Sequence, residues 1–139
     1  MYLNTKLEEF DGSINVAFIG CGKFISMFLS QYNQLKKINI DTIIDLKIDQ
    51  AKKNCLNSGL TQNTINKINF VNSIDEVIDR DIEIFIEATG NPIIGTVHAY
   101  KIIKKKKHVI LVNVEADVIC SMAYGDQPSL ILEQIEWAR

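Results

Sequence analysis

Apolar positions along this chain follow two different periodicities. Five short, nearly continuous apolar runs have the length of β-strands: 14–19, 38–46, 68–71, 82–87 and 108–114. Between them, apolar residues recur with helical spacing at 23–37, 49–56 and 92–104. Strands buried on both faces of a parallel sheet have no polar face and therefore read as continuous apolar runs. The pattern predicts an α/β fold with a doubly wound, mainly parallel sheet of about five strands.

Local signals mark the shorter segments. Helical spacing of apolar residues predicts a short helix over 4–10, and Ser73 with Glu76 three residues later is a capping box that opens a short helix ending at Ile78. The Asn-, Thr- and Gly-rich stretch 57–66 is typical of a loop. The helix 23–37 carries an apolar stripe that we expect to face the core: Phe24, Met27, Phe28, Tyr32 and Leu35.

The first apolar run leads directly into a glycine turn and then into a helix. Gly20, Cys21 and Gly22 separate this strand from the helix that begins near Lys23. In such an arrangement the first glycine permits the tight turn, the second lets backbone amides approach a pyrophosphate, and the positive helix end points at the phosphates. Ile25 stands where a third glycine or an alanine is usual, so we expect its β-branched side chain to push the helix outward.

The second strand ends in an acidic residue. Asp45 follows Gly20 by 25 positions, close to the spacing of ~20 at which a carboxylate meets the adenosine ribose of a dinucleotide. There it would bind both ribose hydroxyls and repel a 2′-phosphate, which favours NAD over NADP. Two alternatives stay open: Asp45 caps the following helix, or Lys47 offsets the repulsion and admits NADP.

The fourth strand ends in small residues. Ala88 and Gly90 would let a cofactor pass over the backbone at the switch point of the sheet, in a segment that also contains Thr89 and Asn91. Pro92 then starts a helix, because its fixed φ suits the first helical turn. A simple strand-to-helix turn explains the same residues equally well.

The end of the fifth strand carries two carboxylates, Glu115 and Asp117. Either could serve as acid or base if buried, and helix capping is the competing role. His98 and His108 have no catalytic partner by spacing, so we expect structural roles for them. The lysine run 104–107 is expected to form a solvated corner at a helix C-terminus.

Composition excludes several classes of function. The chain is 47% hydrophobic and 23% charged with a net charge of −2, which is typical of a soluble globular protein and gives no reason to expect nucleic acid or an anionic membrane. No apolar run approaches the ~20 residues that cross a bilayer, and the N-terminus lacks a secretion signal. The three cysteines, Cys21, Cys55 and Cys120, are too scattered for a zinc site, and their odd number argues against a disulfide framework. We therefore expect a cytoplasmic protein.

Four segments together resemble one enzyme family: GCGKF at 20–24, IEATG at 86–90, VNVEAD at 112–117 and AYGDQP at 123–128. They are similar to the homoserine-dehydrogenase-like NAD(P)-dependent oxidoreductases, which often bear a C-terminal SAF domain and include the deoxyxylulose-phosphate-reductoisomerase-like enzymes. The resemblance covers nearly the whole chain. It implies that residues 1–139 form a Rossmann-like NAD(P)-binding domain, and that the family's later catalytic region lies outside this chain.

The resemblance also implies a cofactor, NAD or NADP, and a small polar or phosphorylated substrate. The implied cofactor-binding residues are Gly20, Cys21, Gly22, Lys23, Phe24, Asp45, Ala88, Thr89, Gly90 and Asn91, and the candidate catalytic residues are Glu115 and Asp117. The sheet edge left without a second domain suggests self-association into a homo-oligomer. The rival hypotheses are a non-catalytic nucleotide-binding module or a decayed enzyme that binds nothing. A methyltransferase fits the segment 89–92 poorly.

One departure from the family concerns topology. A parallel crossover needs about a dozen residues, and too few separate Asp117 from the segment 119–124. This segment must therefore extend the fifth strand, leave the sheet, or pair antiparallel. A final helix is expected over 128–139.

Overall fold

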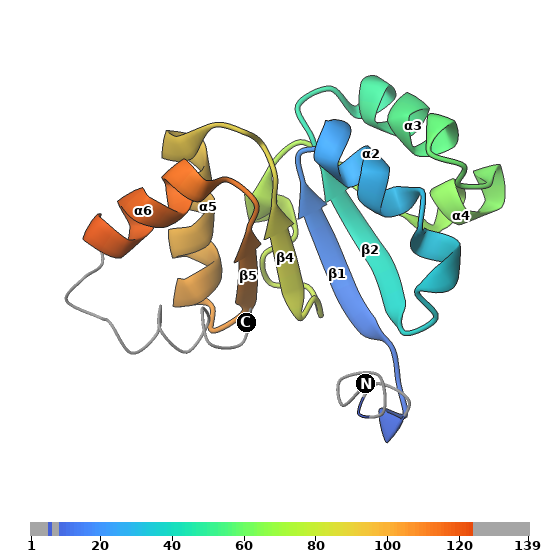
Figure 1. Ribbon diagram of the computed structural model, residues 1–139, viewed down its shortest axis with the longest axis horizontal. Helices are drawn as coiled ribbons and strands as arrows, with labels where there is room; N and C mark the ends of the chain where they lie inside the picture. Colours follow the sequence, from blue (N-terminus) through green and yellow to red (C-terminus); the bar gives the residue numbers. More distant parts are fainter. Residues whose placement is uncertain (1–5, 7–8, 124–139) are drawn as a thin grey trace.

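The computed structural model describes residue 6 and residues 9–123. In this part of the chain, five parallel strands form one sheet in the order β3-β2-β1-β4-β5 (Figure 1). The strands are β1 Ile14–Ile19, β2 Ile38–Ile44, β3 Asn69–Val71, β4 Ile84–Glu87 and β5 His108–Leu111. The predicted α/β fold with a doubly wound parallel sheet is therefore confirmed.

Helices cover both faces of this sheet. They are α2 Lys23–Leu29, α3 Ile48–Asn57, α4 Gln62–Lys67, α5 Pro92–Lys104 and α6 Val114–Ala123, with 3-10 turns η1 Tyr32–Gln34 and η2 Ile74–Glu76. Figure 1 shows α2, α3 and α4 together beside β1 and β2, whereas α5 and α6 pack on each other beside β4 and β5. Within the described residues, no helix is long and apolar enough to cross a membrane.

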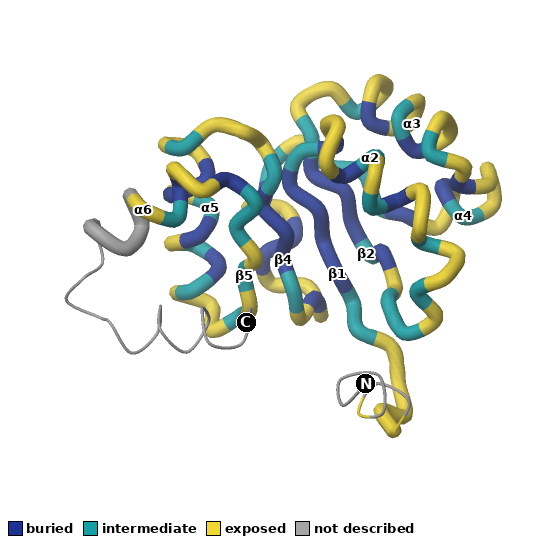
Figure 2. The backbone as a smooth tube through the Cα atoms, viewed as in Figure 1, coloured by how far each residue is buried: buried dark blue, intermediate teal, exposed yellow. Residues whose placement is uncertain are grey.

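Two apolar cores, one on each face of the sheet, follow from the alternation of side chains along β1. Val16 and Phe18 belong to the core under α2, α3 and α4, while Ala17 and Ile19 belong to the core on the opposite face. The central strands β1 and β4 are accordingly the most buried part of the molecule (Figure 2). This buried centre gives the ends of β1 and β4 a rigid base.

The order of the strands creates a switch point between β1 and β4. From β1 the chain moves outward through β2 to β3, and it then returns to β4 on the other side of β1 and continues to β5. The connections that leave the carboxyl ends of β1 and β4 therefore run to opposite sides. Ligands of open α/β sheets bind at such a point.

Helix α5 begins and ends at the predicted residues. Asn91 is its N-cap, with the side-chain Oδ1 accepting hydrogen bonds from the amides of Ile93 and Ile94 at 3.1 Å each. Pro92 follows at the first helical position, where its missing N–H costs nothing. The predicted capping box of Ser73 is also present, at the start of η2.

The predicted helix 23–37 is wrong in length. Helix α2 ends at Leu29. After it, the Gln31 amide donates to the carbonyl of Phe28, three residues back rather than four, so the backbone changes from α-helical to 3-10 hydrogen bonding. Residues 32–34 form the 3-10 turn η1 instead, and Tyr32 still packs against the core from it. The expected stripe is also partly wrong, because Phe24 is 48% exposed and Met27 is 61% exposed.

The predicted loop 57–66 contains the helix α4. Thr61 is its N-cap and accepts a hydrogen bond from the Thr64 amide at 3.2 Å. Ile65 is buried in the core under α2, α3 and α4. Leu60 and Ile68, on either side of the helix, are buried in the same core, so apolar residues and a threonine cap hold a short helix that composition alone did not indicate.

The fifth strand is shorter than predicted, and the segment after it leaves the sheet as α6. The side chain of Asn113 accepts hydrogen bonds from the amides of Glu115 and Ala116, at 3.1 and 3.3 Å, and thereby starts the helix. Of the three expected courses for this segment, leaving the sheet is confirmed. The helix expected over 128–139 and most of the helix expected over 4–10 lie outside the described residues, although the Phe10 amide donates to the Lys6 carbonyl.

Candidate dinucleotide site

The glycine turn (residues 20–22) lies against the turn that follows β4 (residues 88–91, hereafter the 88–91 turn). Gly20 has φ +85°, a conformation that side chains disfavour, and a Cβ there would lie 3.0 Å from the Ala88 carbonyl oxygen and from the Thr89 backbone. The Gly20 amide also donates to the Ile44 carbonyl at 2.8 Å. Glycine is therefore required at this position to bring the two turns together at the switch point.

The first turn of α2 is open to a ligand. Gly22 is the N-cap and has no side chain to accept a hydrogen bond, so no side chain caps α2. A Cβ at Gly22 would meet nothing within 4 Å. The first backbone amides of a helix have no partner inside the helix and attract an anion. Lys23 and Phe24, which supply these amides, are both exposed.

Ile25 does not fill the space in front of the glycine turn. Its side chain is fully buried in the core under α2, together with Phe18 and Leu29. A fully buried side chain cannot occupy the open space beside Gly22. The unusual residue at this position therefore packs against the sheet and leaves the hollow of the turn free.

Asp45 holds the glycine turn from the side of β2. One carboxylate oxygen accepts a hydrogen bond from the Cys21 amide and the other from the Lys47 amide, both at 2.8 Å. Helix α3 has Lys47 as its N-cap residue and no side-chain cap. The alternative that Asp45 caps α3 is therefore wrong, because its carboxylate bonds the loop before the helix.

Asn54 holds the same turn from α3, a contact that the sequence analysis missed. Its side-chain amide donates to the Cys21 carbonyl oxygen at 2.7 Å. Cys21 is thus fixed at its amide by Asp45 and at its carbonyl by Asn54. A polar residue on the buried side of α3, which carries Ala51 and Cys55, could have indicated this role.

The Cys21 thiol is a buried structural group. It lies against α3, with Sγ 3.8 Å from the Ala51 carbonyl oxygen. A hydrogen bond with the Cys55 side chain, together with burial, raises the pKa of the Cys21 thiol well above its usual range. The thiol therefore stays protonated at neutral pH and is not a nucleophile.

The 88–91 turn is tied to a buried acid. Glu87, at the end of β4, has no exposed area, and its Oε1 accepts hydrogen bonds from the amide and the hydroxyl of Thr89. His98 of α5 lies beside it, with Nδ1 3.5 Å from Glu87 Oε1. Sequence spacing indicated no partner for His98, because this contact joins residues of β4 and α5 that are eleven positions apart in the sequence. Gly90, with φ +73°, stands at the open side of the turn.

The two candidate catalytic residues lie in a different setting from the one expected. Glu115 and Asp117 belong to the first turn of α6 and not to the end of a strand. Glu115 is exposed and Asp117 is half-buried. Helix α6 starts beyond β5, so these carboxylates follow a strand that is two positions from β1 in the sheet. Among the described residues, no hydrogen bond or ion pair joins them to the glycine turn.

A hollow of about 310 Å³ lies between α2 and α3 and is lined by Lys23, Ser26, Met27, Ser30, Asn54, Asn57 and Ser58. It adjoins the glycine turn, because Lys23 follows Gly22 and Asn54 bonds the Cys21 carbonyl. Much of its polar lining is already satisfied, since Ser30 donates to the Met27 carbonyl and Ser58 to the Asn54 carbonyl. No group of metal-ligating side chains occurs among the described residues. The candidate site is therefore the pair of turns at the switch point, which the hollow adjoins at Lys23 and Asn54.

The fold is shared with nicotinamide-dependent enzymes. No model of a protein family and no curated protein matches the sequence. Among solved structures, the chain is similar to Staphylococcus aureus homoserine dehydrogenase, with 20% identity over 90% of this chain and 31% of that chain and a TM-score of 0.59. It is also similar to Lactobacillus casei myo-inositol dehydrogenase in complex with NAD(H) and myo-inositol, with 14% identity over 71% of this chain and 28% of that chain and a TM-score of 0.55.

A third solved structure is a 3-ketoreductase from Actinomadura kijaniata in complex with NADP, with 16% identity over 72% of this chain and 30% of that chain and a TM-score of 0.57. The chain thus spans about a third of the length of these enzymes. Likeness at this level of identity establishes a Rossmann-like α/β fold. Activity, substrate and cofactor have to be argued from the site.

Proposed function

We propose that this chain is the NAD(P)-binding portion of an oxidoreductase of the homoserine-dehydrogenase-like family, in the SAF-bearing, reductoisomerase-like branch that its motifs resemble. The observation that carries the proposal is the uncapped first turn of α2, which follows Gly20 and Gly22 at the switch point between β1 and β4. The similarity to a dehydrogenase solved with NAD(H) and to a ketoreductase solved with NADP supports a nicotinamide cofactor.

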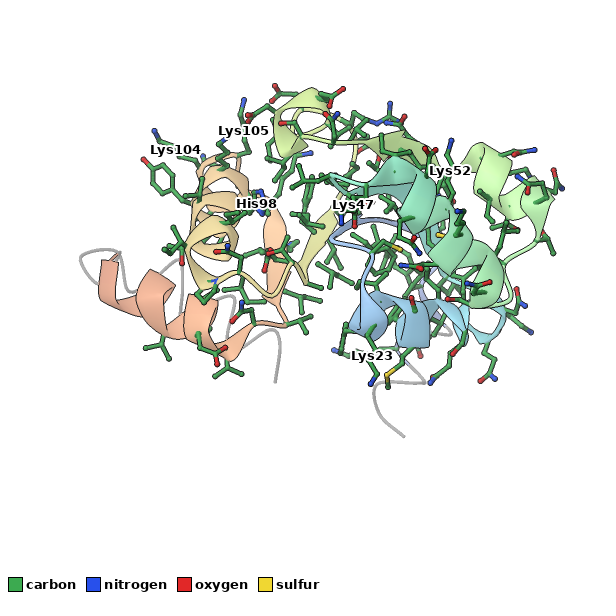
Figure 3. All side chains as sticks on the ribbon, turned by 90° about the horizontal axis from the view of Figure 1, so that it is seen from above. Lys23, Lys47, Lys52, His98, Lys104 and Lys105 are labelled. Carbon is green, nitrogen blue, oxygen red and sulfur yellow. The ribbon has the colours of Figure 1, made fainter. Side chains whose placement is uncertain are left out.

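In this proposal the cofactor pyrophosphate binds the first turn of α2. The Cys21 amide already donates to Asp45, so the amides of Lys23 and Phe24 are the ones left for the phosphate oxygens. The Lys23 side chain adds a positive charge at the same helix end, and Figure 3 shows it on the outer side of α2. The open space beside Gly22 lets the anion approach the backbone.

Asp45 is proposed to bind the adenosine ribose. Each carboxylate oxygen accepts one backbone hydrogen bond at 2.8 Å and can accept another from a ribose hydroxyl. Lys47 is exposed two residues further on, near the carboxyl ends of the strands (Figure 3). Its charge is available to a 2′-phosphate, so the pair allows NAD or NADP, with Asp45 favouring NAD.

The nicotinamide half is proposed to pass over the 88–91 turn. A bound nicotinamide would supply the hydride acceptor or donor for a small polar or phosphorylated substrate. Glu115 and Asp117 are proposed as acid or base residues on the α6 side of that substrate. Of the two, Asp117 is the better placed for a site that excludes water, because it is half-buried.

Calorimetric titration of the purified chain with NAD and with NADP, up to millimolar cofactor, tests the proposal. We expect saturable heat with at least one of them. The absence of heat with both would refute cofactor binding by this chain.

A non-catalytic nucleotide-binding module is the second candidate, and the exposure of Glu115 favours it. A solvated carboxylate is poorly suited to acid–base chemistry. Cofactor turnover separates the two functions. An oxidoreductase changes the absorbance of the reduced nicotinamide with a homoserine-like or sugar-phosphate substrate, whereas a binding module gives saturable heat and no turnover.

A further inference from the structure

Glu87 is a buried acid that the proposed function has not used. It lies at the carboxyl end of β4, its side chain has no exposed area, and one of its oxygens, Oε2, has no hydrogen-bond partner among the described residues. A buried carboxylate is unfavourable unless hydrogen bonds or an opposite charge compensate it. An apolar residue would fill the same place without that cost. The contacts of the other oxygen therefore indicate what the carboxylate does.

These contacts converge on the 88–91 turn. Glu87 Oε1 accepts hydrogen bonds from the Thr89 amide at 3.2 Å and from the Thr89 hydroxyl at 2.5 Å. The Thr89 hydroxyl oxygen accepts in turn from the Asn91 amide at 3.4 Å, and Asn91 caps α5. A single chain of hydrogen bonds thus runs from the buried carboxylate through the turn to the start of the helix.

The helices on this side of the sheet leave room for the carboxylate. A Cβ on Gly95 of α5 would lie 2.8 Å from Glu87 Oε2 and 3.1 Å from the Cβ of Ala116 in α6. The absence of a side chain at Gly95 therefore makes the space that Oε2 occupies. The imidazole of His98 is also on α5 (Figure 3), and its Nδ1 lies 3.5 Å from Glu87 Oε1.

The geometry points to Glu87 as a positioning residue that orients the 88–91 turn for the nicotinamide half of the cofactor. The inference rests on the proposed function. Because the amide and hydroxyl of Thr89 are bound inward, the turn keeps its backbone against Gly20 and presents Gly90 outward. A Cβ on Gly90 would meet nothing within 4 Å, so a ligand can approach the backbone there.

Four single variants, one double variant and two nucleotides test this role. Glu87→Gln removes the charge and keeps the shape, Thr89→Val removes the hydroxyl, and Thr89→Ser retains it. Glu83→Gln is the matched control, since Glu83 lies just before β4 and its carboxylate bonds the Asn15 amide, far along the strand from the turn. Dissociation constants are measured for NAD and for ADP, which has the adenosine and two phosphates but no nicotinamide half.

We expect Glu87→Gln and Thr89→Val each to weaken NAD binding about tenfold, because each removes part of a charge-assisted hydrogen bond. Binding of ADP should change about twofold or less, and Thr89→Ser and Glu83→Gln should bind both nucleotides like the wild type. The double variant of Glu87→Gln with Thr89→Val should bind NAD like Thr89→Val alone, since both changes break the same contact. Without nucleotide, amide exchange at Thr89 should be faster in Glu87→Gln than in the wild type.

Unchanged NAD binding in both variants would overturn the inference. An equal loss of NAD and ADP binding would also overturn it, because that result indicates general damage to the fold. Unchanged amide exchange at Thr89 in Glu87→Gln would show that the carboxylate does not hold the turn. Failure of the proposed function looks different: the wild-type chain would then bind neither nucleotide, and the positioning role would fall with it.

Discussion

The addition of one methyl group should destabilise the chain at Gly20 and have little effect at Gly22. Gly20→Ala places a Cβ at φ +85°, 3.0 Å from the Ala88 carbonyl oxygen and from the backbone of Thr89. These contacts are with backbone atoms, which cannot rotate away as a side chain does. Gly22→Ala places the same group at φ −85°, where nothing lies within 4 Å.

The magnitudes follow from these two environments. A left-handed conformation costs a non-glycine residue about 1–2 kcal/mol. Overpacking a tight contact costs about 1–3 kcal/mol more. Gly20→Ala should therefore lower the free energy of unfolding by about 2–5 kcal/mol. For Gly22→Ala the loss of a favoured N-cap residue and the reduced entropy of the unfolded chain oppose each other, each at about 0.5–1 kcal/mol, so little net change is expected.

Urea denaturation of the wild type and of both variants measures this difference. Gly12→Ala is the control for the general effect of replacing glycine, because a Cβ there meets only the flexible Phe10 ring, at 3.3 Å. The midpoint should fall for Gly20→Ala and change little for Gly22→Ala and Gly12→Ala. A Gly20→Ala variant as stable as the wild type, or an equal loss in both turn variants, would refute the close contact between the two turns.

Three further predictions concern charge and thiol chemistry. Asp45→Ala should weaken NAD binding about tenfold or more, because it removes a charge-assisted contact with the ribose. NADP binding should weaken less, because the same change removes the repulsion between the carboxylate and the 2′-phosphate. Equal losses for the two cofactors in calorimetry, or a similar loss in the exposed control Asp49→Ala, would contradict the ribose role. Burial raises the pKa of Asp41, but hydrogen bonds from Arg80 and Thr42 outweigh it, so the pKa lies below its usual value near 3.8. The stabilisation by this pair, whose side chains are 19% and 48% exposed, is therefore present above that pH and lost as Asp41 is protonated. Arg80→Ala should lower the free energy of unfolding by about 0.5–1 kcal/mol at neutral pH. Denaturation curves of the wild type and the variant should show that this difference disappears in acid. A difference that does not change with pH would refute the assignment of the stabilisation to this pair. The raised pKa of the buried Cys21 thiol predicts much slower alkylation by iodoacetamide in the native chain than in urea, and mass spectrometry showing equal rates would contradict it.

The parts of the fold that the sequence predicted are those with strong local signals. Five apolar runs identified all five strands, and Pro92 with the preceding Asn91 marked the start of α5. The Ser73 capping box was also a local signal. In each case the residues that decide the structure are neighbours in the sequence, so pattern and propensity were enough.

The parts that the sequence analysis missed depend on tertiary contacts. Ile25 was expected to push α2 outward; the structure shows that its side chain is buried in the core, and the outward displacement stays a prediction. The bond from the Cys21 amide to Asp45 and the approach of His98 to Glu87 join residues from different elements. The spacing of apolar residues along the chain does not indicate which residues from different elements will pair. The sequence thus indicated the two turns that the fold brings together, but the groups that hold these turns required coordinates.

Nuclear magnetic resonance of the ¹⁵N-labelled chain, titrated with NAD, tests the central claim most directly. The claim is that the exposed amides at the start of α2 bind the pyrophosphate. We expect the amide signals of Gly22, Lys23 and Phe24 to shift most and to saturate together. The amide signals of the 88–91 turn should saturate at the same cofactor concentration. Saturable shifts confined to other parts of the chain, or no shifts at millimolar NAD and NADP, would contradict it.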